Sequence, residues 1–142
     1  MFYPRLRFPC ARQRRRERKQ MKLEIGCGAS PRGDMNCDLL TADTLRRLDV
    51  EKRKPKELPN FMRCGANHLP FRSKVFDECC AHHVLEHKPV KPKQTVNEML
   101  RVTNGIVKIV VPHRFMDAKR PSKHHARTFN IKTLDRHACR EP

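Results

Sequence analysis

Residues 23–28 have the sequence LEIGCG, in which a short apolar strand breaks into two glycines. Glycine carries no Cβ, so the backbone at Gly26 and Gly28 can turn tightly and approach a bound ligand closely. A second strand-like segment ends in Asp38, whose carboxylate can accept hydrogen bonds from ribose hydroxyl groups. A G-x-G pair also occurs in ordinary turns, but a glycine turn followed by a carboxylate is the arrangement of a nucleoside site.

The length and hydropathy of the chain limit its architecture. Its 142 residues suffice for one domain with a modest core. Hydrophobic residues make up 37% of the chain and charged residues 33%, and the mean hydropathy is −0.79, yet the apolar residues cluster in runs, as in a folded domain. No run approaches the ~20 apolar residues of a membrane span, and no apolar signal-peptide core is present near the start. We therefore expect a cytoplasmic protein that does not bind membranes.

The cysteines indicate a reducing compartment. There are seven of them, an odd number, no C-x-x-C motif occurs, and several lie in apolar strand-like runs. This pattern is typical of reduced, mostly buried thiols rather than of a disulfide framework or a zinc ribbon.

Basic residues dominate the charge, and the formal net charge is +17. A surface of this sign attracts nucleic acid, anionic lipid or acidic partners, so nucleic acid is a candidate partner. One tyrosine and no tryptophan argue against base stacking on single strands. The sequence does not indicate an oligomeric state.

Residues 1–20 contain eight lysines and arginines and no apolar periodicity. We expect a basic, disordered tail there, ahead of a single domain at 21–142. Three interpretations of the tail stay open: an arm that binds RNA or DNA, an organelle transit peptide, and an extension upstream of a natural start at Met21. The absence of serine from the tail argues against a transit peptide.

Strand and helix patterns alternate from Met21 onward. Strands are expected at 22–26, 34–39, 60–64, 75–81 and 106–112, and helices at 41–52 and 94–102. Asn104 and Gly105 are expected to cap the second helix. The β-branched run at 106–112, bounded by Gly105 and Pro112, predicts a central strand buried on both sides. This alternation predicts a parallel sheet with ligands at the carboxyl ends of its strands.

Three further motifs follow in order: LPF at 69–71, FDE at 76–78 and HVLEH at 83–87. Together with the glycine turn they resemble the class I S-adenosylmethionine-dependent methyltransferases, in particular the type 11-like subgroup. The resemblance covers about residues 21–130. It implies a Rossmann-like, three-layer α/β sandwich with a mainly parallel sheet of about five strands. It also implies methyl transfer from S-adenosylmethionine to an acceptor that the sequence does not identify.

The resemblance implies a set of cofactor-binding residues that follow the first four strands: Glu24, Gly26, Cys27, Gly28, Asp38, Gly65, Ala66, Asn67, Ala81 and His82. The glycine turn would lie against the methionine part of the cofactor, and Asp38 would bind the ribose. Residues 65–67 match the turn that flanks the adenine. Ala81 and His82 match a strand end that faces the methionine moiety and the substrate.

The chain departs from the family pattern at three places. Ala29, Ser30 and Pro31 follow Gly28 where the family has the third glycine of the turn. Gly65 stands where relatives often have an aspartate that binds the adenine amino group. The chain also ends at Pro142, before the usual antiparallel strand pair, so we expect a truncated sheet without that pair. These departures keep two alternatives open: an inactive relative, and a degenerate methyltransferase fold that binds nucleic acid through its basic surface.

Methyl transfer from a sulfonium is an in-line displacement, in which the protein mainly positions the nucleophile and excludes water. No catalytic residue is therefore assigned. If a general base is needed, His82 and His83 are the candidates, because they follow the fourth strand. An N/D-P-P-Y/F box is absent, which argues against adenine or glutamine as the acceptor.

The HVLEH motif at 83–87 also fits H-x-x-E-H, in which two histidines on one helix face bind zinc. A third ligand would then come from His113, His124, His125 or a cysteine. A third interpretation is the start of a structural helix with His87 facing solvent. The methyltransferase resemblance favours no metal. It also relates HHARTF at 124–129 to a segment near the substrate mouth, where we expect Phe129 to pack and the histidines to be solvated.

Overall fold

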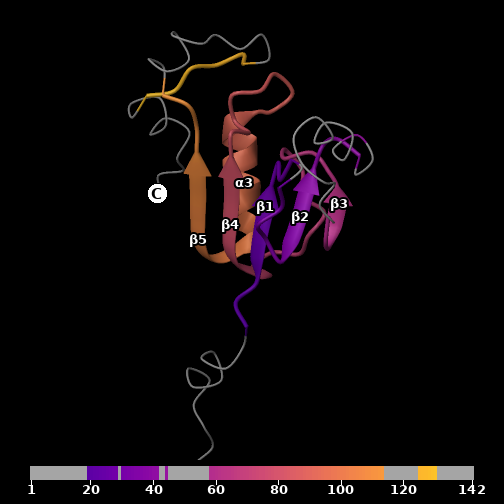
Figure 1. Cartoon of the computed structure of the whole chain (residues 1–142). Helices are drawn as coiled ribbons and strands as arrows, with labels where there is room; N and C mark the ends of the chain where they lie inside the picture. The colour runs from indigo at the N-terminus through magenta and orange to yellow at the C-terminus, as the bar shows by residue number, and fades with distance from the viewer. Residues whose placement is uncertain (1–18, 29, 42–43, 45–57, 114–124, 131–142) are drawn as a thin grey trace, which may run out of the picture.

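The computed structural model describes residues 19–28, 30–41, 44, 58–113 and 125–130, and the structural statements below concern these residues. They form five strands and one helix (Figure 1). The strands are β1 (Lys22–Ile25), β2 (Met35–Asp38), β3 (Phe61–Arg63), β4 (Phe76–His82) and β5 (Thr103–Val110), and the helix is α3 (Pro92–Val102).

The five strands form one sheet in the order β3-β2-β1-β4-β5, and every pair of neighbours is parallel. Leu23 of β1, for example, pairs with Met35 of β2 on one side and with Cys79 of β4 on the other. All five carboxyl ends therefore lie along one edge, at the top of Figure 1. This arrangement confirms the expected Rossmann-like α/β fold, and within the described residues the sheet has no antiparallel strand.

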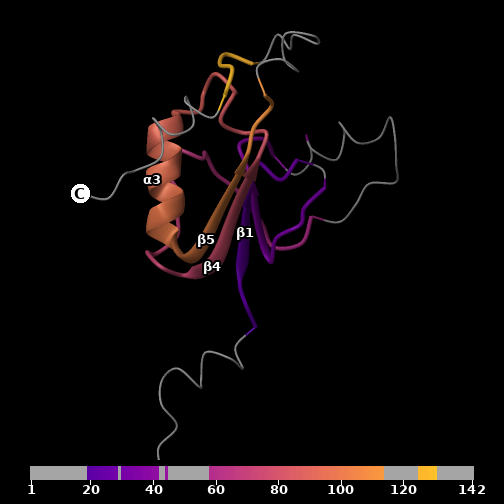
Figure 2. The same ribbon diagram turned by 90° about the vertical axis from the view of Figure 1, so that its left-hand side faces the viewer.

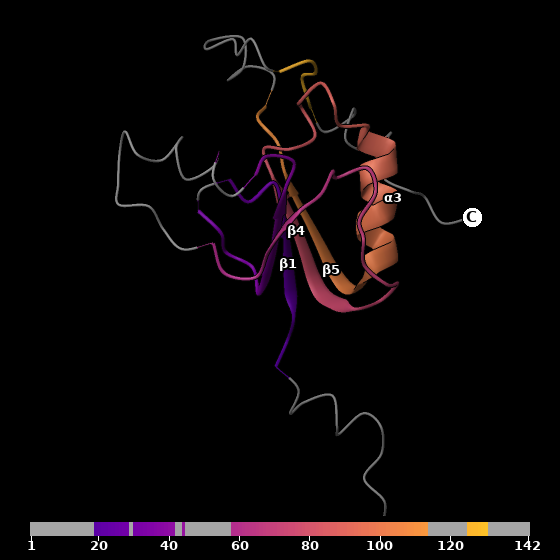
Figure 3. The same ribbon diagram turned by 90° about the vertical axis from the view of Figure 1, so that its right-hand side faces the viewer.

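α3 covers one face of the sheet, over β4 and β5, as Figures 2 and 3 show from opposite sides. It begins at Pro92, two residues before the expected start, because proline's fixed φ and missing N–H suit the first helical position. The core beneath it is assembled from both layers: Leu23, Phe76, Leu85, Met99, Val102 and Phe129. The helix expected at 41–52 lies almost entirely outside the described residues.

The position expected for the strand at 106–112 is wrong. β5 is an edge strand of this sheet, and Ile106 and Val110 are 59% and 43% exposed. The central places belong to β1 and β4, whose buried side chains include Leu23 and Cys79. β-Branched residues favour strand geometry on edge and central strands alike, so the run indicated a strand without fixing its neighbours.

The expected cap at Asn104 and Gly105 is also wrong. α3 ends at Val102, and Thr103 is already extended, with its backbone N–H and its hydroxyl both bonded to the Met99 carbonyl. β5 begins there without a loop. Gly105 is required for another reason: a Cβ on it would collide with the carbonyl oxygen of Asp77, beside the register shift between β4 and β5.

The expectation of reduced, mostly buried thiols is confirmed for the five cysteines that the structure describes. All are free; Cys27, Cys37, Cys79 and Cys80 are buried, and Cys64 is half-buried. No helix in the described ranges is both long and apolar enough to cross a lipid bilayer.

An ion pair within α3 holds the LPF loop against this helix. The Arg101 guanidinium donates to Glu98 at 2.7 and 2.8 Å and to the carbonyls of Leu69 (2.9 Å) and Phe71 (2.8 Å). Glu98 also accepts the Leu69 N–H at 2.8 Å. The LPF motif and the α3 residues 97–102 (NEMLRV) are therefore two sides of one contact.

We expect Arg101→Gln to lower the free energy of unfolding by more than Lys108→Gln does, because it removes charge-assisted hydrogen bonds to Glu98 and the loop carbonyls. Denaturant titration at neutral pH measures this change. Lys108→Gln is the control, since Lys108 pairs with Glu78 on the surface, where an ion pair contributes about 0–1 kcal/mol. Equal losses in both variants would contradict a special role for Arg101.

The same pair predicts a pH dependence. The Arg101 guanidinium beside Glu98 lowers the pKa of this carboxyl from 4.5 to about 2. Because the folded-state pKa lies below the unfolded one, the stabilisation is complete above pH 4.5 and is lost as the pH falls towards 2. We expect the stability difference between wild type and Glu98→Gln to shrink over this interval in acid titrations followed by circular dichroism. A constant difference would contradict the prediction.

Candidate functional site

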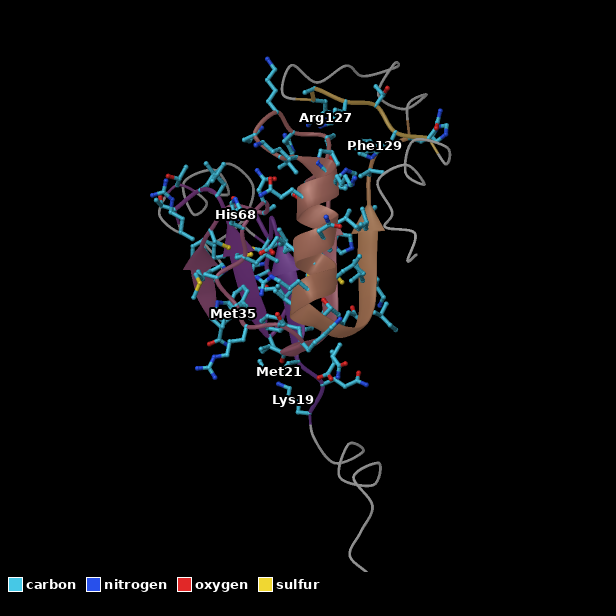
Figure 4. All side chains as sticks on the ribbon, turned by 180° about the vertical axis from the view of Figure 1, so that it is seen from behind. Lys19, Met21, Met35, His68, Arg127 and Phe129 are labelled. Carbon is cyan, nitrogen blue, oxygen red and sulfur yellow. The ribbon has the colours of Figure 1, made fainter. Side chains whose placement is uncertain are left out.

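The ends of β3, β2, β1 and β4 meet at the carboxyl edge of the sheet, and every predicted site residue lies on or just after one of these strands. In Figure 4 the labelled residues Arg127 and Phe129 mark the side of this edge, and Lys19 and Met21 mark the side of the opposite edge. The parallel pairing of the strands therefore brings together residues that the sequence separates by up to 58 positions, as between Glu24 and His82.

The two glycines after β1 have different physical requirements. Both are in the left-handed region, with φ of 64° at Gly26 and 56° at Gly28, which favours glycine. A Cβ on Gly26 would overlap the side chain of Val84, whereas a Cβ on Gly28 would meet no atom within 4 Å. Gly26 is thus needed for packing against the loop after β4, and Gly28 leaves open space above the turn.

Asp38 connects the glycine turn to the end of β2. One carboxylate oxygen accepts the N–H of Gly28 at 3.0 Å, and the other accepts the N–H of Leu40 at 3.0 Å. The Asp38 backbone carbonyl accepts the Cys64 N–H at 2.9 Å, which ties the residue to the segment after β3. Each carboxylate oxygen retains a second lone pair that can accept a ligand hydroxyl.

Glu24 lies beneath the turn rather than at its surface. It is 3% exposed, its carboxylate accepts the N–H of Arg32, and His82 Nδ1 lies 3.4 Å from Oε1. The carboxylate therefore holds the loop after the glycines to the end of β4. Ala81 is fully buried in the core, opposite Ile25 in the parallel register.

The three residues of the turn after β3, at 65–67, have different surroundings. A Cβ on Gly65 would meet only a Leu39 methyl at 3.9 Å, so this position is open. Ala66 packs against the core. The Asn67 amide donates to the Pro89 carbonyl at 2.9 Å and accepts from the backbone N–H of Lys91 at 2.7 Å, so its side chain anchors the start of α3.

The Cys27 thiol is a packing group and not a nucleophile. Burial, followed by the carboxylates of Asp38 and Glu24, raises its pKa from 9.0 to about 12. The thiol therefore stays protonated at neutral pH, and only a thiolate would react.

Residues 83–87 do not form the helix that the zinc and structural-helix interpretations require. β4 runs to His82, His83 has a φ of 55°, and the chain then forms turns. Val84 and Leu85 are both buried within these turns.

The expectation that His125 is merely solvated is wrong, while the packing role of Phe129 is confirmed at 2% exposure. His125 forms an antiparallel bridge with His87, and its Nε2 lies 3.9 Å from the Glu86 carboxylate. No local pattern indicates this contact, because it joins segments far apart in the sequence. His124 and the arginine block at 1–18 lie outside the described residues, so nucleic-acid binding stays a prediction.

The glycine geometry predicts unequal substitution effects. We expect Gly26→Ala to lower the free energy of unfolding by about 2–4 kcal/mol, because it combines an unfavourable φ with overlap of Val84. Gly28→Ala should cost about 1–2 kcal/mol from the positive φ alone. Denaturant titrations of both variants test the difference, and a Gly28→Ala protein at least as destabilised as Gly26→Ala would contradict it.

Comparisons with known proteins agree with this geometry. The profile of a family described as "Methyltransferase domain" matches residues 23–109, which is more than half of the chain. A search of the curated proteins found no match.

Several solved structures share the fold. The YcgJ protein of Bacillus subtilis is 20% identical with a TM-score of 0.62, over 83% of this chain and 59% of that one. A Thermotoga maritima protein, described as an SAM-dependent methyltransferase and possible histamine N-methyltransferase, is 17% identical with a TM-score of 0.64, over 84% of this chain and 62% of that one.

A third structure has its ligands bound. Phosphoethanolamine N-methyltransferase 2 of Haemonchus contortus, in complex with phosphomonomethylethanolamine and S-adenosylhomocysteine, is 16% identical with a TM-score of 0.53, over 88% of this chain and 34% of that one. The chain thus spans less than two thirds of the length of each of these structures. At these identities the similarity shows the fold.

Proposed function

The chain belongs to the family of methyltransferase domains, and on this premise we propose that it binds S-adenosylmethionine at the carboxyl edge of β1 to β4. It then transfers the methyl group to an acceptor that carries a nucleophilic atom. The observation that carries the proposal is the bond between Gly28 and Asp38, which places an open glycine turn beside a carboxylate.

The residues at this edge fit the cofactor. The space above Gly28 admits a ligand against the backbone, and the remaining lone pairs of Asp38 suit two ribose hydroxyls. The open side of Gly65 suits the flat face of an adenine, although this position lacks a carboxylate for the adenine amino group. Asn67 holds this turn to the segment before α3 through its hydrogen bonds to Pro89 and Lys91.

The bound cofactor would supply an electrophilic methyl group on a sulfonium with a good leaving group. The chain then has to hold the acceptor in line and exclude water, which contributes most of the rate enhancement in such displacements. Glu24 contributes to this positioning because it holds the loop after the glycine turn to the end of β4.

His82 is the better placed of the two candidate bases. When its Nδ1–H donates to Glu24, at 3.4 Å, Nε2 is left unprotonated and able to accept a proton from an oxygen or nitrogen acceptor. His83 is 60% exposed and lies nearer Glu86, 3.3 Å from Oε1. The acceptor stays unidentified, and a cytoplasmic location and nucleic-acid binding stay predictions.

Calorimetric titration of the full chain with S-adenosylmethionine and S-adenosylhomocysteine tests the proposal. We expect micromolar binding of both, weakened at least tenfold, or about 1.4 kcal/mol, in Asp38→Ala. Asp34→Ala is the matched control, because Asp34 lies at the opposite edge of the sheet, where it accepts the Lys22 N–H and pairs with Lys19.

Two outcomes would overturn the proposal. One is a folded wild-type chain that binds neither ligand, and the other is equal affinity in wild type and Asp38→Ala. Circular dichroism establishes folding in each case. Asp38→Asn, which keeps one acceptor oxygen, provides a second and milder variant if Asp38→Ala is unstable.

A further inference from the structure

The Glu86 side chain is fully buried, and its two carboxylate oxygens are the only buried side-chain oxygens in the described residues that lack a hydrogen-bond partner. A buried carboxylate without compensation costs several kcal/mol, so it is normally protonated, paired or bound to a metal. The groups that approach it are imidazoles. His83 Nδ1 lies 3.3 Å and His125 Nε2 3.9 Å from Oε1, and neither forms a hydrogen bond with it.

Three potential metal ligands converge here. One ligand atom each of Glu86, His87 and His125 lies within 4.8 Å of the other two. In a tetrahedral zinc site the ligand atoms lie ~2.0–2.2 Å from the ion and therefore about 3.4 Å from one another. Shifts of up to ~1.4 Å at the ring nitrogens of the half-buried imidazoles would close the cluster to that size.

The backbone holds the two histidine segments together without an ion. His87 and His125 form an antiparallel bridge, and their rings meet edge to face with centroids 5.4 Å apart. The Ala126 N–H donates to the Glu86 carbonyl at 2.8 Å, and Arg127 donates to the His87 carbonyl at 2.9 Å. The segment 125–130 therefore lies over the loop that follows β4, as Figure 1 shows in yellow above that loop. A site prearranged in this way loses little conformational entropy on binding.

We propose that Glu86, His87 and His125 bind one zinc ion that fastens the segment 125–130 to the loop after β4. Two imidazoles and one carboxylate are a ligand set that zinc uses, and such a set leaves the fourth tetrahedral position open. The ion would supply a fixed positive charge to the buried Glu86 carboxylate, which otherwise lies near imidazoles alone. The site does not depend on the proposed cofactor function, and it differs from the helical H-x-x-E-H arrangement because its second histidine comes from a distant segment.

The test uses the full chain without a histidine tag, stripped of metal with a chelator and titrated with zinc chloride. We expect one zinc ion per chain, with affinity reduced at least a hundredfold in His87→Gln and in His125→Gln. His68→Gln is the matched control: His68 is exposed and contacts Gln94, away from the cluster, and its substitution should leave zinc affinity unchanged.

Cobalt(II) distinguishes this site from the cysteines. Bound by two imidazoles and a carboxylate, cobalt gives visible d–d absorption without the ultraviolet charge-transfer bands of thiolate ligands. Thermal denaturation adds a measurement independent of the spectra, because zinc should raise the Tm of wild type but not of the two histidine variants.

Glu86→Gln keeps the test valid if the histidine variants do not fold. It removes the buried charge at constant shape, so we expect a metal-free fold at least as stable as that of wild type and no stoichiometric zinc binding. The proposal is overturned if wild type takes up no stoichiometric zinc, if uptake is unchanged in Glu86→Gln or both histidine variants, or if the cobalt spectrum shows thiolate ligands.

Discussion

Hydrogen bonding between β1 and β4 joins the two halves of the sheet, and the remaining arrangement depends on its parallel direction and register. Ile25 lies opposite Ala81, so the glycine turn after β1 and the histidines after β4 emerge side by side. A shift of one residue would reverse which side chains face the core, and buried Leu23 and Cys79 oppose that shift. The register thus determines that Gly26 meets Val84 and that Glu24 reaches His82.

Buried polar side chains then fix loops at both edges of the sheet, Glu24 at the carboxyl edge and Asn36 at the amino edge. Glu24 and Asn36 are almost inaccessible, and each binds a loop backbone: Glu24 that of Arg32, and Asn36 those of Gly33 and Pro59. Such groups are costly to bury unless every partner is present, so they select one loop conformation. At the carboxyl edge, Glu24 thereby restrains the loop that follows the open position at Gly28.

The sequence was sufficient for the parts of the fold that depend on local pattern. Short apolar runs located all five strands, and the glycine turn and Asp38 were identified together because their motif lies on adjacent strands. The edge position of β5 was missed, because a β-branched run does not specify its neighbours. The contact between Glu86 and His125 was also missed, since it depends on how a distant segment crosses the loop after β4.

The edge position of β5 has a consequence for the behaviour of the protein in concentrated solution. Within the described sheet β5 has a strand partner on one side only, and exposed Ile106 and Val110 lie along it. An edge of this kind can template pairing with another chain. Lys108 lies between these two residues, but its ammonium group bonds to Glu78 of the neighbouring β4 and so lies away from the open edge. The charge of this lysine therefore does not shield the edge against intermolecular sheet growth.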